Sequence, residues 1–282
     1  MTRRRKFLKS VGSLTVIGAA GTAHAKGKRR RNREKSNEES DEWEKIYEQS
    51  LLNSDLHKKI SEGFREDGSK KVEEVLEESD IVYDQATVKV DTDRNSGDDS
   101  EFTTQDMYTR GEAEMNVLTL NASPADTISV FTQMFLNGTN MSVGSAKYLE
   151  DVIGTTWDKE HYEVVGEPYV IAADPHNASF HSESYQEGGL SAKVNLKTNN
   201  WLGDLPEGDN GNMAIELYSQ LEYIGDNITP IFGHYKHTEA ADPSGTIESI
   251  TVNKGSVEVE LSGLESKVLW EKGEFSDPSE YI

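Results

Sequence analysis

The residues best suited to hold a metal ion lie in an acidic stretch between positions 91 and 99. Its possible oxygen ligands are Asp91, Asp93, Asn95 and Asp99. Hard cations such as Ca²⁺ bind clusters of carboxylate and amide oxygens of this kind. The stretch is not an EF-hand, because Gly97 comes one place late and Phe102 stands where the closing glutamate should be. A Ca²⁺ site and a solvated acidic loop are both compatible with it.

Histidines form a second set of candidate ligands, because imidazoles bind Zn²⁺ or Cu²⁺ where they converge with a third ligand. His234 and His237 lie three residues apart in a segment that reads as a strand. They should therefore point to opposite faces and cannot share one ion. His176 and His181 lie with Asp174 in a loop-like stretch, where a metal site and ordinary surface histidines are the alternatives.

Signatures of specific catalysis are missing from the sequence. It contains no nucleophile elbow, no His-Glu-x-x-His helix, no phosphate loop and no dinucleotide glycine pattern. It also lacks cysteine, which excludes disulfides, thiol catalysis and cysteine-ligated zinc. We therefore expect no enzyme and no cofactor beyond the candidate Ca²⁺, with an extracellular hydrolase built around the histidine loop as an alternative.

Five Asn-x-Ser/Thr sequons are candidate glycosylation sites if the chain is exported. They are Asn121, Asn137, Asn140, Asn177 and Asn227. Asn121 and Asn227 lie near the ends of expected strands, where access should be poor.

The first 25 residues have the three-part layout of a cleaved export signal. A basic start precedes a mild apolar run over residues 10–22, which is shorter than the roughly 20 residues needed to span a membrane. The start resembles a twin-arginine signal in Arg4, Arg5, Phe7 and Leu8, although Arg3 replaces the usual Ser or Thr. Ala23 and Ala25 place cleavage after position 25. The implied partners are the twin-arginine translocase and a signal peptidase.

The charge of the chain divides sharply between its start and its body. Residues 1–35 hold 12 Lys and Arg and one acid, whereas residues 36–282 hold 17 basic and 50 acidic residues, a net charge of −33. Such a body repels itself in dilute buffer, and concentrated salt screens the repulsion within a few ångström. We expect a protein that works in brine, and the charge disfavours binding to nucleic acid or anionic lipid.

Four regions follow along the chain. After the signal, residues 26–39 read as a basic disordered linker, with docking to an acidic surface and a protease site as alternatives. Residues 40–79 read as short amphipathic helices capped by Ser40, Ser54 and Ser69. Residues 80–282 alternate with a period of two and predict an antiparallel β-sandwich, so the overall class is mainly β. No further membrane-spanning segment is expected.

About nine strands are expected in the last region, separated by turn residues. The clearest hairpin has Asn253-Lys254-Gly255 between two alternating runs within 247–261. We expect residues 146–153 to form a short helix or a strand. The expected strands are 81–90, 107–120, 128–135, 162–172, 190–196, 213–224, 231–237, 247–261 and 268–271.

Two resemblances bear on origin and role. The twin-arginine start and the acidic body resemble uncharacterised exported proteins of extremely halophilic archaea. The run Phe232-Gly-His-Tyr-Lys-His-Thr238, the alternating strands over 247–261 and Trp270 resemble the lactococcin 972 type of β-sandwich bacteriocin. The second resemblance implies a secreted antimicrobial, or halocin. The favoured hypothesis is an extracellular or cell-surface protein that binds a surface protein or glycan.

Overall fold

The computed structural model describes most of the chain after position 53 and one short segment before it. The described residues are 2–6, 54–89, 113–122, 126–136, 150–172, 177–180, 188–195, 213–225, 227–239, 244–263 and 266–280. Within these ranges, no helix is long and apolar enough to cross a membrane.

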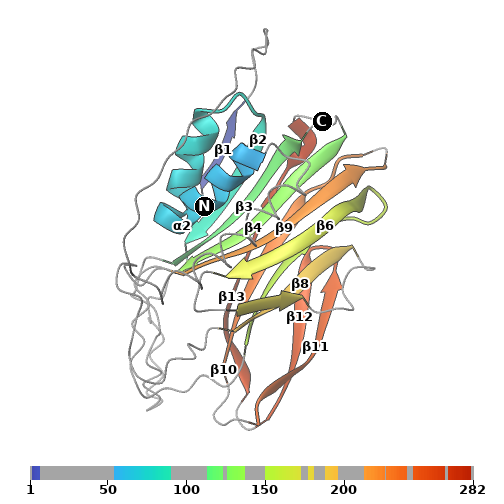
Figure 1. The fold of residues 1–282 in the computed structure, drawn as a ribbon. Helices are drawn as coiled ribbons and strands as arrows, with labels where there is room; N and C mark the ends of the chain where they lie inside the picture. Colours follow the sequence, from blue (N-terminus) through green and yellow to red (C-terminus); the bar gives the residue numbers. More distant parts are fainter. Residues whose placement is uncertain are drawn as a thin grey trace, which may run out of the picture.

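Two antiparallel sheets face each other and form the body of the molecule (Figure 1). Sheet A has the order β1-β2-β3-β4-β9-β6, formed by Thr2–Lys6, Tyr83–Lys89, Ala113–Ala122, Thr127–Leu136, Met213–Tyr223 and Tyr162–Ala172. Sheet B has the order β13-β10-β5-β8-β7, formed by Lys267–Ser276, Ile231–Glu239, Asp151–Thr156, Gly189–Asn195 and Asn177–Phe180. A short 3-10 helix, Pro278–Glu280, follows β13. The predicted mainly β sandwich is confirmed.

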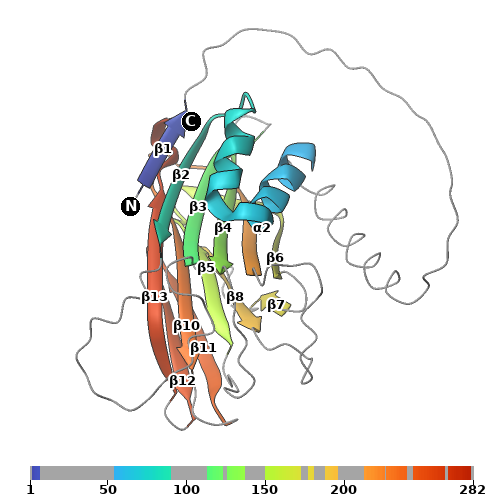
Figure 2. The same cartoon turned by 90° about the vertical axis from the view of Figure 1, so that its left-hand side faces the viewer.

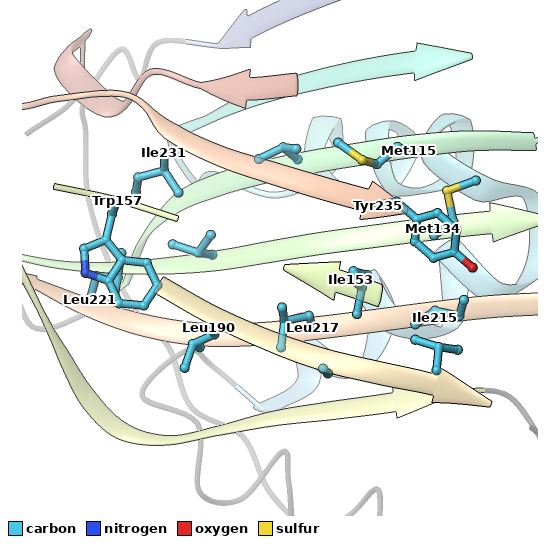
Figure 3. Close-up of a cluster of buried hydrophobic side chains, with 14 of the residues drawn as sticks. Met115, Met134, Ile153, Trp157, Leu190, Ile215, Leu217, Leu221, Ile231 and Tyr235 are labelled. Atoms are coloured by element: carbon cyan, nitrogen blue, oxygen red, sulfur yellow. The ribbon is translucent and has the colours of Figure 1, made fainter. Parts of the chain in front are cut away.

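The space between the sheets holds the largest apolar cluster (Figure 3). Sheet A contributes Met115, Met134 and Leu217, and sheet B contributes Ile153 and Tyr235. At β10, a Cβ added to Gly233 would lie 2.5 Å from Val117 Cγ2 on sheet A. Only a residue without a side chain fits between the layers there.

Helix α2, Ser54–Glu77, covers the other face of sheet A (Figure 2). Its buried apolar residues are Ile60, Phe64, Val72 and Leu76, which lie on one face as the predicted amphipathic helices require. Asp67 and Gly68 leave helical geometry, with φ of +62° at Gly68, so α2 is two helices joined at a kink. The second of these begins near the expected Ser69, where Glu114 Oε1 on β3 accepts the Ser69 amide at 2.5 Å.

A hairpin of β11, Thr246–Asn253, and β12, Ser256–Ser262, covers part of sheet B. It turns at the predicted Asn253-Lys254-Gly255, and Gly255 supplies the positive φ of +77° that such a turn requires. Alternate residues of β11 are buried, and Ile250 and Val252 pack with Val152 of β5. The molecule therefore has four layers, in the order helix, sheet A, sheet B and hairpin.

The helical alternative for 146–153 is wrong over the residues that the structure describes, because Asp151–Thr156 forms strand β5. β5 lies between β10 and β8, and all six of its residues are buried. A central strand covered on both faces does not alternate, so its sequence lacks the period of two that marks an outer strand. Short β7 and the amino-terminal β1 were also not expected as strands.

Candidate functional site

A row of polar side chains crosses sheet A on the face that α2 covers. Thr87, Asn116, Gln133 and Glu216 lie directly opposite one another on β2, β3, β4 and β9. Thr87 Oγ1 donates to Asn116 Oδ1 at 3.2 Å, and Asn116 Nδ2 donates to Gln133 Oε1 at 2.8 Å. Gln133 Nε2 then donates to Glu216 Oε2 at 2.6 Å. The polar row, as we call these four residues, links four strands through side chains alone.

The carboxyl group of Glu216 ends the polar row, and donors from other elements surround it. Oε1 accepts Ser61 Oγ of α2 at 2.8 Å and the Tyr169 hydroxyl of β6 at 2.5 Å. Burial raises the pKa of Glu216, although these hydrogen bonds and nearby Arg65 oppose the shift. One carboxyl group therefore joins the helix, the central strands and the edge strand of sheet A.

His57 of α2 extends the network beyond Tyr169. Its Nε2 lies 2.6 Å from the Tyr169 hydroxyl and 3.9 Å from Glu216 Oε1. The imidazole packs among three rings, with centroids 4.4 Å from Tyr218, 5.1 Å from Phe131 and 5.7 Å from Tyr169. Burial lowers the pKa of His57 to about 3, so the ring is neutral at ordinary pH.

The three groups form a continuous chain of hydrogen bonds, Glu216 to Tyr169 to His57. A hydroxyl in contact with both a carboxyl oxygen and an imidazole nitrogen can pass a proton between them. Glu216 and His57 are buried, and Tyr169 on the edge strand β6 is the partly exposed member. The arrangement is capable of proton transfer, and it also fixes the helix at one position on the sheet.

A second buried carboxylate lies in sheet B. Asp151 begins β5, and its Oδ2 accepts the Tyr235 hydroxyl at 2.6 Å and lies 2.9 Å from His237 Nδ1. Its Oδ1 accepts the Thr238 amide at 3.0 Å. These contacts hold β5 against β10 at the point where the ladder between β10 and β13 shifts register. Asp151 therefore stabilises an irregular part of the sheet.

The two strand histidines lie apart, as the sequence predicted. His237 contacts Asp151, whereas His234 Nε2 lies 3.2 Å from Thr156 Oγ1. Burial lowers the pKa of His234 to about 4. No group of three or more His, Asp or Glu side chains in the described ranges is arranged to hold a metal. The histidine loop with Asp174, His176 and His181 lies outside these ranges.

Most of the other predicted site residues also lie outside the described part of the chain. These are Phe7, Leu8, Ala23, Ala25, Asp91, Asp93, Asn95, Asp99, Asn137 and Asn140. Arg4 and Arg5 lie in β1, where the backbone register places them opposite Gln85 and Asp84 of β2.

The remaining sequons lie on or beside strands. Asn121 is partly buried near the end of β3, and Asn177 begins β7. Asn227 is exposed in the bend between β9 and β10, which differs from the poor access that its position suggested. A bend between strands leaves its side chains outside the ladder, so closeness to a strand end did not imply burial.

Sequence reasoning missed the Glu216, Tyr169 and His57 network. One signal was available, since Glu216 stands in the apolar run Met213–Leu217 at a position that faces a covering layer. With 50 acidic residues in the body, this signal does not stand out. Recognising it required knowing that sheet A is covered on both faces.

The segments that carry the bacteriocin resemblance come together in the structure. The Phe232–Thr238 run lies within β10, the alternating runs form the β11–β12 hairpin, and Trp270 of β13 lies opposite His237 of β10.

No family model and no curated protein matches the chain. Among solved structures, one described as "pH-induced modulation of Streptococcus parasanguinis adhesion by Fap1 fimbriae" is 12% identical, with a TM-score of 0.26 over 68% of this chain and 94% of that chain. A likeness at this TM-score carries no argument about fold or function.

Proposed function

We propose that this chain is an exported, salt-adapted binding protein that acts without catalysis in the medium or at the cell surface. The twin-arginine translocase would carry it across the membrane, and a signal peptidase would remove residues 1–25. Its partner would be a surface protein or a glycan.

The observation that carries the proposal is the acidic coat on both outer layers. Glu62, Glu66 and Glu74 are exposed on α2, while Glu258 and Glu260 are exposed on the hairpin. Their apolar neighbours point inward in both elements. Repulsion among such carboxylates weakens the compact state in dilute buffer and is screened in concentrated salt. A coat of this kind suits a protein whose surroundings are brine.

The use of two buried carboxylates, Glu216 and Asp151, supports binding rather than catalysis. Glu216 accepts three side-chain donors from the fold, and Asp151 accepts the Tyr235 hydroxyl and a backbone amide. A general acid or base needs an oxygen that can reach a substrate proton. These oxygens are instead occupied in holding layers together, which leaves outer surfaces and loops as the places for recognition.

Export is tested with residues 1–35 fused to a reporter that folds before translocation. The fusion should leave the cytoplasm and lose residues 1–25. The double substitution Arg4→Lys with Arg5→Lys should lower the exported amount of the fusion at least tenfold. Arg29→Lys with Arg30→Lys is the matched control and should not change export. Equal export of all three fusions would exclude the twin-arginine route.

Binding is tested with labelled protein beginning at Lys26, incubated in concentrated salt with intact cells of the producing organism. Saturable retention should fall after protease treatment of the cells if the partner is a protein, and after periodate treatment if it is a glycan. A heat-unfolded sample serves as the control. Retention no greater than that control would contradict the binding role.

A further inference from the structure

The outer strand of sheet B, β13, meets sheet A at one corner of the sandwich. Ser276 near the end of β13 reaches across to sheet A, where its Oγ lies 2.5 Å from Thr119 Oγ1 of β3. The same hydroxyl donates to the carboxylate of Asp84 on β2, with Oδ2 at 3.1 Å. Asp84, Thr119 and Ser276 are each at most 1% exposed, so this group of oxygens lies inside the protein.

A second carboxylate faces the same corner. Glu274 lies two residues before Ser276, and residues two apart on a strand share a face. Glu274 also stands opposite Gly233 of β10, where an added Cβ would meet Val117 of sheet A at 2.5 Å. Since directly opposite residues of an antiparallel pair share a face, both observations direct the side chain of Glu274 towards sheet A.

The carboxyl group of Glu274 has one oxygen that the surrounding protein does not satisfy. Glu274 is 3% exposed, and its Oε1 accepts the Phe275 amide at 3.1 Å. This bond turns the carboxyl group towards Ser276 and away from Lys272, which lies two residues back along the strand. Oε2 is buried without a hydrogen-bond partner in the part of the chain that the structure describes. A buried charged oxygen in that condition is unfavourable, which indicates a ligand that supplies positive charge.

The side chains at this corner offer only oxygen atoms, the ligands that Ca²⁺ prefers. They are the carboxylates of Asp84 and Glu274 and the hydroxyls of Thr119 and Ser276. Ca²⁺ takes about six to eight oxygens at roughly 2.3–2.6 Å in a variable geometry, and water can complete the set. The two carboxylates also match the double positive charge of the ion. Mg²⁺ requires a stricter octahedron and gives up its water reluctantly, so a buried corner of this kind favours Ca²⁺.

We propose that Asp84 and Glu274 bind a Ca²⁺ ion between β2 and β13, with the hydroxyls of Thr119 and Ser276 beside it. The ion joins sheet A to the outer strand of sheet B. In a chain without cysteine, it supplies a link between the two sheets that no disulfide can provide. The site is separate from the acidic stretch over residues 91–99.

Thermal unfolding of the full chain tests the site. The protein is first freed of divalent ions with a chelator and kept in molar KCl, which screens the surface carboxylates. Ca²⁺ at about a hundredfold excess over its dissociation constant should raise Tm by about 5 °C, because it binds the folded state alone. The same concentration of Mg²⁺ should raise Tm by no more than about 2 °C. An equal rise with both ions would overturn the assignment to Ca²⁺.

Glu274→Gln distinguishes an ion ligand from a side chain that only supports the fold. In chelator, the variant should be at least as stable as the native chain, because it removes an unpaired buried charge. With Ca²⁺, its Tm should not rise. Glu271→Gln is the matched control on the same strand, with a side chain that is 65% exposed, and should keep the full rise. A full rise in Glu274→Gln, or none in the native chain, would contradict the site.

The acidic stretch over residues 91–99 is tested separately by Asp91→Asn combined with Asp93→Asn. This double variant should keep the full rise of Tm with Ca²⁺. Loss of the rise would assign the bound ion to that stretch and remove it from the corner.

Hydrogen exchange in the native full chain keeps the test independent of every variant. Ca²⁺ should slow exchange about tenfold at amides of β2 and at the end of β13, and it should leave the β11–β12 hairpin unchanged. Unchanged exchange in β2 and β13 would show that the ion does not join these strands. Neither measurement depends on export or on retention by cells, so its outcome is separate from that of the proposed function.

Discussion

The two outer layers of the molecule are attached in different ways. Helix α2 lies on sheet A over both an apolar cluster and the polar row that ends at Glu216. The β11–β12 hairpin lies on sheet B over an aliphatic cluster that includes Val152, Val252 and Val257. Hydrogen bonds between buried groups have one correct arrangement, whereas aliphatic contact is non-directional. The helix is therefore held by a buried hydrogen-bond network, whereas the hairpin is held mainly by shape, with the Gly255 amide at its turn donating to Thr156 Oγ1 at 3.0 Å.

The shape that receives the hairpin depends on two glycines in sheet B. A Cβ added to Gly154 would lie 2.8 Å from Val257 Cγ2, and one added to Gly189 would lie 2.3 Å from Val252 Cγ1. Both distances are closer than real side chains approach. The missing side chains leave space for the two valines, which helps to explain how a layer that contacts sheet B mainly through aliphatic side chains can still have one position.

The largest effect is expected where the directional attachment is broken. Glu216→Ala removes the acceptor of three donors, from Ser61, Gln133 and Tyr169, and should lower the free energy of unfolding by about 3 kcal/mol or more. Denaturant titration in concentrated salt measures the loss, and hydrogen exchange should locate it in α2. Glu222→Ala, at an exposed position on the same strand, is the control and should stay within about 0.5 kcal/mol of the native value. A loss spread equally over α2 and the hairpin would contradict the comparison.

The attachment of the hairpin by shape is tested at Gly189, one of the two glycines that leave space for its valines. Gly189→Ala should lower the free energy of unfolding by about 2 kcal/mol, since backbone at Thr155 as well as Val252 opposes the new methyl group. Exchange should rise in β11 and β12 while α2 keeps its protection. Thr251→Ala, exposed on the same hairpin, provides the matched variant with little expected change. Loss of protection in α2 would mean that the two layers are not independent.

Acid should act on helix α2 through His57 and on sheet B through His234 of β10. The folded-state pKa is lowered to about 3 for His57 and to about 4 for His234, from 6.5 in the unfolded chain. Below pH 6.5 the unfolded chain binds more protons, so each histidine lowers stability by up to about 1.4 kcal/mol per pH unit as pH falls. His234 stops contributing near pH 4, whereas His57 continues to about pH 3.

The sign for Glu216 is opposite, because its raised pKa favours the folded state as pH falls through the carboxyl range. The histidine contributions are therefore read from slopes of stability against pH in variants. His57→Gln should flatten the slope between pH 6.5 and about 3, and His234→Gln only between pH 6.5 and about 4. Slopes identical to that of the native protein would show that burial does not keep these rings neutral.

The smallest effect is expected at the rim of the hairpin. Lys254 Nζ lies 2.5 Å from Asp158 Oδ2, and the lysine side chain is 60% exposed. Because the lysine end of the pair is open to solvent, while Asp158 is only 13% exposed, the pair should contribute about 1 kcal/mol in dilute salt and less as salt rises. Lys254→Ala should therefore be detectable in dilute buffer and indistinguishable from native in molar salt. A loss that persists in molar salt would show that the Lys254–Asp158 pair holds the hairpin by more than a screened charge interaction.

The sequence predicted the elements better than it predicted their contacts. Period-two alternation located β3, β4, β9 and the hairpin, and Ser54 and Ser69 marked the two halves of α2. The alternation did not locate β5, because that strand is buried on both faces and its residues do not alternate between apolar and polar. The polar row was invisible because its members become neighbours only through the strand register, and register between distant strands follows from the folded layers.

The far edge of sheet A has a feature that matters in crowded solution. The ladder between β6 and β9 shifts register between Val165 and Tyr169, and Gly166 adopts a φ of +73° there. A bulge twists an edge strand and interrupts the regular spacing that an incoming chain would need in order to continue the sheet. The side of β6 that faces away from β9 thus resists templated growth into fibrils. This matters wherever dense ions screen the mutual repulsion that keeps acidic molecules apart.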